Sequence, residues 1–216
     1  TYGDWSSDVC SSDLDVTAGI AMLGIMGPKS RALLAAVSGA DLSNAAHPFG
    51  QSREIEIGYA RPRASRITYV GELGWELYIP AEQVLDVYER LVEAGAEFGL
   101  QHAGYHAMAA CRVEKGYRHW SHDIADEDTP LEAGLGFTVA WDKEGGFIGR
   151  EALLAQKQRG ALTKRLVQVM LEDHSPTAPL LYHEEPIIRD GEIVGSTRSG
   201  ARSEEHTSEL QSPYVI

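Results

Sequence analysis

The sequence predicts an α+β fold in which helices pack against antiparallel sheets. Amphipathic helical patterns alternate with pairs of strand-like segments, and glycine-bearing loops join the members of each pair. No strand–helix–strand rhythm typical of a parallel sheet is present. From about residue 164 onward the pattern becomes mostly β, which predicts that a second, all-β, barrel-like domain begins there and is truncated.

The first predicted elements are a strand and a helix. Residues 20–25 form an apolar run of strand length, and Gly27-Pro28 interrupts it. Residues 30–37 are rich in alanine and leucine, and Gly39 follows them as a natural helix stop. Proline is tolerated in the first turn of a helix, so Pro28 is compatible with this assignment.

Three strand candidates follow. Residues 53–59 alternate charged and apolar side chains, which is typical of a half-buried strand. Residues 66–70 and 75–79 are predicted to form a hairpin across the glycine-bearing loop 71–74.

Two helices are predicted next. Residues 81–98 have the most regular helical pattern in the chain, and Gly99 follows as a C-terminal stop. Residues 102–115 form the second candidate. The apolar face predicted for the first helix consists of Val84, Tyr88, Leu91 and Val92.

A capping motif opens the next part of the chain. Thr129 and Glu132 have the spacing of a capping box, in which each side chain binds the other residue's backbone N–H. Residues 137–141 are predicted to be a strand and residues 149–158 a helix.

The mostly β segment is assigned to residues 164–201. It contains a predicted strand at 166–171 and a predicted hairpin at 187–194. Asp190-Gly191 lies at the centre of that hairpin and is typical of a type I′ turn.

Both ends of the chain are predicted to be foreign to the protein. Residues 4–14 read DWSSDVCSSDL and residues 202–212 read RSEEHTSELQS. A single DNA sequence can encode the first segment while its reverse complement encodes the second, as expected for a sequencing adapter translated in both directions. We therefore assign residues 1–14 and 202–216 to an adapter artefact and expect the natural protein to extend beyond both junctions.

Composition excludes several function classes. The formal net charge is −13, which argues against a nucleic-acid groove because such grooves need clustered lysine and arginine. No apolar run is long enough to span a membrane, and we expect a cytoplasmic protein of undetermined oligomeric state. With Cys10 assigned to the adapter, Cys111 is the one remaining cysteine, so no intrachain disulfide is expected.

An ordered series of motifs resembles the aminomethyltransferase family, to which the T-protein of the glycine cleavage system belongs. The match covers essentially residues 15–201, and residues 15–163 are identified as part of the folate-binding domain. The motifs are GIMGPKSRALL at 24–34, RITYVGELGWELYIP at 66–80, CRVEKGY at 111–117, Asp123-Ile124, TPLEAGL at 129–135 and FIGREAL at 147–153.

The amino-acid sequence at residues 69–78 and 114–120 is more similar to one branch of the family than to the other. That branch is found in the C-terminal half of FAD-dependent dimethylglycine and sarcosine dehydrogenases. This resemblance implies a small-molecule N-methyl amine as substrate, tetrahydrofolate as the one-carbon acceptor and FAD in a part of the parent outside this chain. The family's catalytic aspartate would lie upstream of residue 15. The alternatives are a stand-alone aminomethyltransferase and a non-catalytic, folate-binding regulatory module.

The resemblance implies three folate-binding residues. Glu114 matches the pterin-anchoring glutamate, and a carboxylate can accept two adjacent N–H donors at once; it could instead be a helix-end residue paired with Arg112 or Arg118. Tyr69 would line the pterin slot, or else act as a cross-strand packing partner. Lys143 would meet the carboxylates of the folate tail, or else be an exposed loop lysine.

Other chemistry-bearing residues favour structural roles. His102 and His106, with His119 and His122 nearby, have a spacing that can bind a metal, but no His-Glu-x-x-His pattern is present and a third partner would be needed, so no metal site is predicted. Gly145-Gly146 lacks the strand and helix context of a dinucleotide-binding loop. The tryptophans Trp75, Trp120 and Trp141 could flank the ligand, but we assign them to the core.

Overall fold

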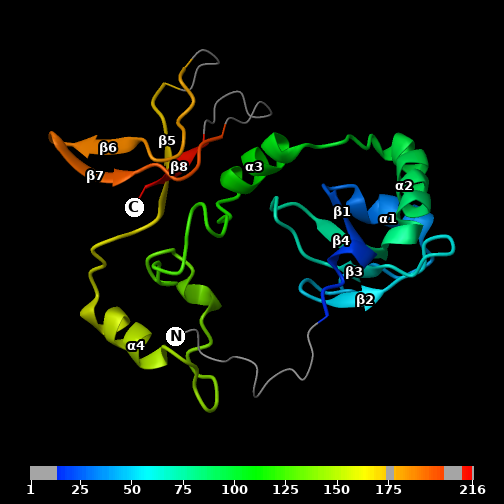
Figure 1. The fold of residues 1–216 in the computed structure, drawn as a ribbon, viewed down its shortest axis with the longest axis horizontal. Coiled ribbons are helices and arrows are strands. Elements are labelled where there is room, and N and C mark those ends of the chain that lie inside the picture. Colours follow the sequence, from blue (N-terminus) through cyan, green and yellow to red (C-terminus); the bar gives the residue numbers. More distant parts are fainter. Residues whose placement is uncertain (1–13, 174–177, 202–210, 216) are drawn as a thin grey trace. The chain divides into compact units, whose positions relative to one another are not determined.

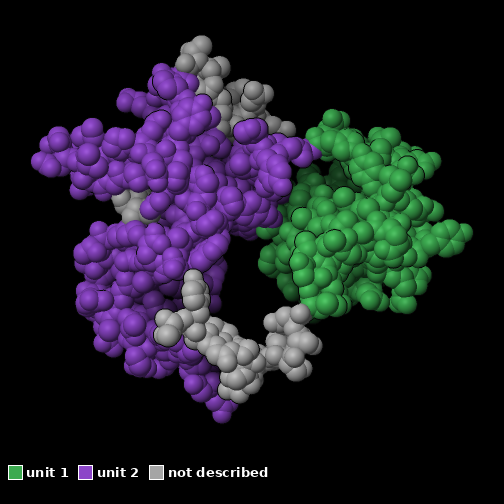
Figure 2. Space-filling model, in the orientation of Figure 1, with its two compact units in different colours: residues 1–68, 72–102 green, residues 69–71, 103–216 purple. Residues whose placement is uncertain are grey.

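The computed structural model describes residues 14–173, 178–201 and 211–215 (Figure 1). The chain divides into two compact units. Unit 1 comprises residues 1–68 and 72–102, and unit 2 comprises residues 69–71 and 103–216 (Figure 2).

Unit 1 is built on a four-stranded antiparallel sheet. Its strands are β1 (Ile20–Met26), β2 (Ser52–Glu54), β3 (Arg63–Ser65) and β4 (Gly74–Pro80), in the spatial order β1-β4-β3-β2. A short 3₁₀ turn, Thr17–Gly19, leads into β1. The edge strand β1 lies beside β4 along its full length (Figure 1).

The alternation of side chains along β4 determines which face of the sheet is buried. Trp75, Leu77 and Ile79 are each 0% exposed, whereas Tyr78 between them is 37% exposed. Helices α1 (Ser30–Val37) and α2 (Val84–Phe98) also contribute to this core, mainly through the buried side chains Leu33, Leu34, Val87 and Leu91. The strand at 20–25 and the helix at 30–37 are therefore confirmed.

The predicted hairpin of 66–70 with 75–79 is wrong in its first strand. The partners of β4 are β1 and β3, with Ala64 of β3 opposite Leu77. After β3 the backbone pairs elsewhere, because Arg66 N–H donates to the Gln51 carbonyl at 2.8 Å. Residues 69–71 then belong to unit 2. The predicted strand 53–59 is likewise shorter, since β2 ends at Glu54 and only a single bridge joins Ile57 to Ala60.

The predicted helix 81–98 is confirmed apart from its first turn, which is the 3₁₀ segment Ala81–Gln83. Its buried face was predicted only in part. Val87, Leu91 and Gly95 are the buried residues, at four-residue spacing. Tyr88 was assigned to this face but is 39% exposed, and its hydroxyl lies 2.9 Å from Nε2 of His102.

Unit 2 contains the remaining helices and strands. The helices are α3 (Tyr105–Glu114) and α4 (Arg150–Arg159), with a 3₁₀ turn at Gly136–Thr138 between them. The strands are β5 (Val167–Met170), β6 (Pro186–Arg189), β7 (Glu192–Ser196) and β8 (Gln211–Val215). They form two separate antiparallel pairs, β5 with β8 and β6 with β7. That these strands belong to a truncated β-barrel domain remains a prediction.

Local sequence chemistry predicted several elements of unit 2 correctly. Asp190 and Gly191 have φ angles of 54° and 84° and connect β6 to β7, as a type I′ turn requires. Thr129 and Glu132 form the expected reciprocal contacts, with Thr129 N–H donating to Glu132 at 3.0 Å and Glu132 N–H donating to the Thr129 hydroxyl at 3.2 Å. The predicted helix at 149–158 corresponds to α4.

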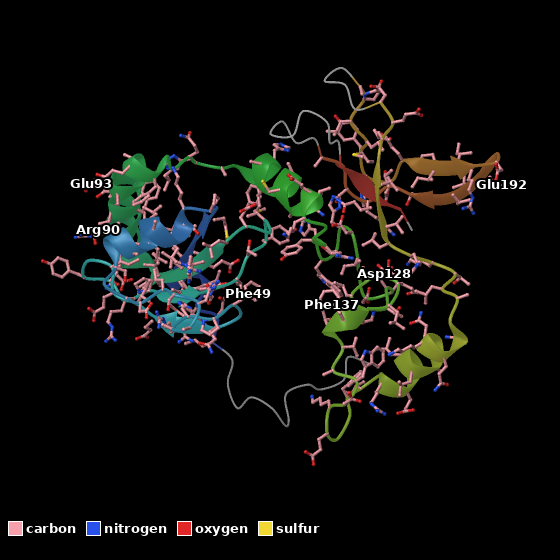
Figure 3. All side chains as sticks on the ribbon, turned by 180° about the vertical axis from the view of Figure 1, so that it is seen from behind. Phe49, Arg90, Glu93, Asp128, Phe137 and Glu192 are labelled. Atoms are coloured by element: carbon pink, nitrogen blue, oxygen red, sulfur yellow. The ribbon has the colours of Figure 1, made fainter. Side chains whose placement is uncertain are left out.

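The predicted strand at 137–141 is wrong. Phe137 lies in the 3₁₀ turn, and its side chain is 83% exposed (Figure 3). The turn is closed locally, because Thr138 N–H donates to the Leu135 carbonyl at 2.9 Å. These local bonds occupy groups that a sheet ladder would need.

Most of the two predicted adapter segments lies outside the described residues. Strand β8 is the part of 202–216 whose backbone is described, and it pairs with β5. The origin of both segments stays a prediction. No helix in the described part of the chain is both long and apolar enough to cross a membrane.

Candidate functional site

A buried ion pair lies just beyond the C-terminal end of α3. The guanidinium of Arg112, on the last turn of this helix, pairs with the carboxylate of Asp123. Their side chains are 5% and 0% exposed. Because isolated charges are costly to bury, each is stabilised by further hydrogen bonds.

Three further groups complete this network. The Ser199 hydroxyl donates to Asp123 Oδ1 and accepts a bond of 2.6 Å from Arg112 Nη2. The backbone N–H of His119 donates to Asp123 Oδ2 at 2.8 Å. Arg112 Nη1 also donates to the Tyr117 carbonyl at 3.3 Å. The network therefore fixes the turn that follows α3.

A row of aromatic and imidazole rings extends from this network. Tyr69 packs edge-on against His119 with ring centroids 6.3 Å apart. His119 stacks on His122 at 5.5 Å, and His122 contacts His183 at 4.4 Å. No group of three or more histidine, cysteine or acidic side chains that could hold a metal ion occurs among the described residues.

Burial changes the acid–base properties of two of these rings. It raises the pKa of the Tyr69 hydroxyl above its ordinary value; Arg112 opposes this shift and Asp123 reinforces it. Burial lowers the pKa of His122 below 6.5, and the neighbouring His183 acts in the same direction. Tyr69 therefore remains a neutral hydroxyl, able to donate and to accept a hydrogen bond.

The loop that carries Tyr69 lies directly against the end of α3. A Cβ atom added at Gly71 would come within 2.6 Å of Cβ of Lys115 and would overlap Cγ. Gly71 also has a φ of 81°, which glycine adopts without strain. Lys115 directly follows Glu114, so this close approach brings the Tyr69 loop beside the predicted pterin anchor.

The three predicted folate-binding residues all lie in unit 2. Glu114 is the last residue of α3 and is half-buried, and Tyr69 is also half-buried. Lys143 is exposed in the loop before α4, where its backbone N–H donates to the Ala140 carbonyl at 3.1 Å. The close approach joins Gly71 and Lys115, which lie next to Tyr69 and Glu114 in the chain, and the folate-binding roles of all three residues stay predictions.

The carboxylate and the aromatic hydroxyl suit a reduced pterin. A half-buried carboxylate can accept the amino and ring N–H donors of the pterin together, and a partly desolvated environment strengthens such bonds. The ring of Tyr69 offers an apolar surface for the bicyclic ring, and its hydroxyl offers a polar contact. Arg112 pairs with Asp123, and the other predicted role of Glu114, a helix-end residue paired with Arg112 or Arg118, stays a prediction.

The three tryptophans differ in how far they are buried. Trp75 is a core residue as predicted, with 0% exposure. Trp120 is 62% exposed, so its assignment to the core is wrong. Trp141 is half-buried, its indole N–H donates to the Gly136 carbonyl at 3.3 Å, and the Lys157 ammonium lies 4.4 Å from its ring centroid.

Asp123, Ser199 and His183 were assigned no role from the sequence, and His119 and His122 were weighed only as metal ligands. Asp123 did belong to a quoted family motif, and its position four residues after His119 is a local pattern. Ser199 carries no comparable signal, since it lies 87 positions from Arg112.

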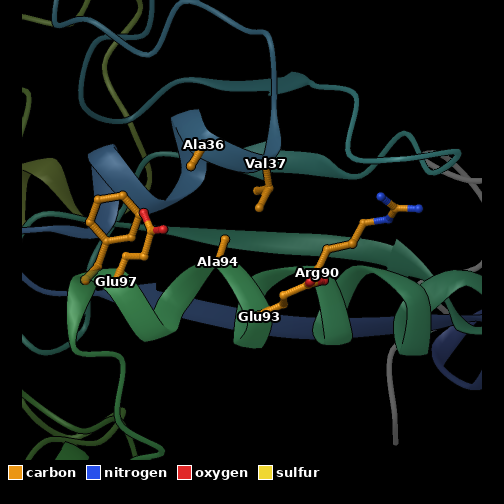
Figure 4. Close-up of a pocket in the computed structure, with 7 residues that line it drawn as sticks. Ala36, Val37, Arg90, Glu93, Ala94 and Glu97 are labelled. Atoms are coloured by element: carbon orange, nitrogen blue, oxygen red, sulfur yellow. The ribbon is translucent and has the colours of Figure 1, made fainter.

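A separate hollow lies in unit 1 between α1 and α2 (Figure 4). It contains none of the predicted site residues. Its lining includes Ala36, Val37, Arg90, Glu93, Ala94 and Phe98.

Comparison with known proteins places this arrangement in a family. The model of the GCVT N-terminal domain matches residues 6–143, a range that includes part of segment 4–14. The chain is 44% identical to 4-methylaminobutanoate oxidase (formaldehyde-forming) of Paenarthrobacter nicotinovorans, over 87% of the chain and 22% of that protein. It is also 44% identical to the mitochondrial sarcosine dehydrogenase of Homo sapiens, over 86% of the chain and 20% of that protein.

A third relative is the mitochondrial pyruvate dehydrogenase phosphatase regulatory subunit of Mus musculus, 38% identical over 88% of the chain and 22% of that protein. The chain thus spans about a fifth of the length of these relatives. In structure it resembles the glycine cleavage system aminomethyltransferase T of Bartonella henselae, with a TM-score of 0.71, 23% identity, and coverage of 91% of this chain and 51% of that one. The chain therefore belongs to the GCVT N-terminal domain family and has the aminomethyltransferase fold.

Proposed function

We propose that this chain is the tetrahydrofolate-binding part of an FAD-dependent dehydrogenase acting on N-methyl glycines such as sarcosine or dimethylglycine. The observation that carries the proposal is the close approach of the Tyr69 loop to the end of α3, next to Glu114. The likeness to an oxidase and a dehydrogenase at 44% identity supports the oxidoreductase context.

In the proposed reaction the parent oxidises the N-methyl amine to an iminium, which releases formaldehyde on hydrolysis. Formaldehyde condenses with two nitrogens of tetrahydrofolate to give methylene-tetrahydrofolate and water. Glu114 would orient the pterin by accepting two of its N–H bonds, and Tyr69 would cover the ring. Orientation of this kind accelerates the condensation because it replaces a bimolecular encounter.

FAD would be held by the part of the parent outside this chain, where its role is to accept a hydride from the amine. The described residues contain no glycine-rich turn between a strand and a helix, so no flavin contact is assigned to them. The family's catalytic aspartate is likewise expected upstream of residue 15.

The test uses the full-length parent. Under anaerobic conditions, sarcosine or dimethylglycine should bleach the flavin absorbance. Without tetrahydrofolate, one equivalent of free formaldehyde should appear per flavin reduced; with tetrahydrofolate, most of it should appear as methylene-tetrahydrofolate. A flavoenzyme that releases the same amount of formaldehyde in both cases would contradict the folate role.

Two alternatives are separated by the same measurement. A stand-alone aminomethyltransferase, suggested by the structural likeness to the Bartonella henselae protein, would be colourless and would transfer an aminomethyl carbon to tetrahydrofolate. A regulatory module, suggested by the likeness to the phosphatase regulatory subunit, would bind folate with neither reaction.

A further inference from the structure

Asp123 is the centre of the buried network in unit 2, yet none of the proposed ligand contacts involves it. Its fully buried carboxylate receives the Arg112 guanidinium, the Ser199 hydroxyl and the His119 backbone N–H. A carboxylate this far from water is stable only while such donors stay in place. The groups bound to it are therefore held in fixed positions.

One branch of this network leads to Glu114. Arg112 lies two positions before Glu114 on the last turn of α3. Besides binding Asp123, Arg112 exchanges backbone and side-chain bonds with Tyr117, whose N–H donates to the Arg112 carbonyl at 2.8 Å. The end of α3 and the turn after it thus form one hydrogen-bonded unit.

The other branch leads to Tyr69. Asp123 holds the backbone of His119, and the His119 ring packs against the Tyr69 ring. His119 also stacks on His122, the residue next to Asp123. One carboxylate therefore fixes the surroundings of both half-buried residues of the proposed pterin site.

We propose that Asp123 is a positioning residue of the folate site, holding Glu114 through Arg112 and Tyr69 through His119. Ser199 extends the same network to the segment after β7, so folate affinity depends on that segment as well. The inference rests on the proposed function, since it concerns the site at which tetrahydrofolate would bind.

The test substitutes Asp123→Asn in the full-length parent and measures tetrahydrofolate affinity by titration. Asparagine keeps the shape but loses the charge that holds Arg112. Asp128→Asn is the matched control (Asp128 is labelled in Figure 3), because Asp128 also has a buried side chain, 4% exposed, and pairs with Lys164 at 2.5 Å. Asp123→Asn should weaken folate binding about tenfold, and Asp128→Asn less than about twofold, even where both lower the unfolding midpoint.

A double-mutant cycle with Glu114→Gln distinguishes positioning from general destabilisation. If Asp123 acts through Glu114, the combined loss of affinity should be smaller than the product of the single losses by several-fold. Independent, multiplicative losses would overturn the inference. Should Asp123→Asn fail to fold, Ser199→Ala removes one hydroxyl from the same network and should still weaken folate binding measurably; unchanged affinity would overturn the inference.

The two hypotheses fail differently. If the wild-type parent shows no tetrahydrofolate binding, the proposed function is wrong. If it binds tetrahydrofolate but Asp123→Asn and Asp128→Asn behave alike, only the positioning role is wrong.

Discussion

Replacing Gly71 with alanine tests the contact between the Tyr69 loop and the end of α3. The new Cβ atom would lie within 2.6 Å of Lys115 Cβ. Rotation of the lysine side chain cannot relieve this overlap, because Cβ is attached directly to the backbone. The loop or the helix end must therefore move.

The expected cost has two parts. A φ of 81° disfavours alanine by about 1–2 kcal/mol. Overpacking at a tight contact adds about 1–3 kcal/mol. The matched control is Gly50→Ala, because Gly50 has a φ of 82° but its new methyl group would have no neighbouring atom within 4 Å. The control should show the first cost alone.

The assay compares unfolding midpoint and tetrahydrofolate affinity for the wild-type parent and both variants. Gly71→Ala should lower the midpoint more than Gly50→Ala, by roughly 2–4 °C for each additional kcal/mol. It should also weaken folate binding, because the displaced loop carries Tyr69, whereas the control should leave folate binding intact. Equal behaviour of the two variants would refute the proposed contact.

Three further predictions concern single side chains. Glu114→Gln removes the charge of the proposed pterin anchor, and a charged hydrogen bond contributes about 1.5–3 kcal/mol. Tetrahydrofolate affinity should therefore fall roughly tenfold to a hundredfold in a titration, while anaerobic flavin reduction stays unchanged. Loss of both activities would indicate that Glu114 belongs to a structural ion pair instead. The pKa of His122 is lowered in the folded state, so the folded protein loses stability as the pH falls below 6.5. His122→Gln should reduce that loss when denaturant titrations at pH 7 and pH 5 are compared. An unchanged pH dependence would contradict the burial of this imidazole. Thr129→Val removes the hydroxyl that accepts the Glu132 N–H and should lower the free energy of unfolding by about 1 kcal/mol, whereas a neutral effect would mean that the capping contact adds nothing to stability.

The elements that the sequence determined by itself are those whose chemistry lies within a few residues. Asp190-Gly191 specifies its turn because both residues tolerate a positive φ. Thr129 and Glu132 satisfy each other's backbone across three positions. The alternation of Trp75, Leu77 and Ile79 places one face of β4 in the core. The family motifs likewise indicated Glu114 and Tyr69 as candidates.

Only the tertiary structure decided which distant groups meet. Arg112, Asp123 and Ser199 form one network although Ser199 is 76 positions from Asp123, and no local pattern encodes such a pairing. The choice of hydrogen-bonded partner also explains why the predicted strand 66–70 is wrong. Arg66 pairs with Gln51, and β3 is the strand that lies beside β4 in its place. A strand is defined by its hydrogen-bonded partner as much as by its own side chains, and that partner is fixed only when the chain folds.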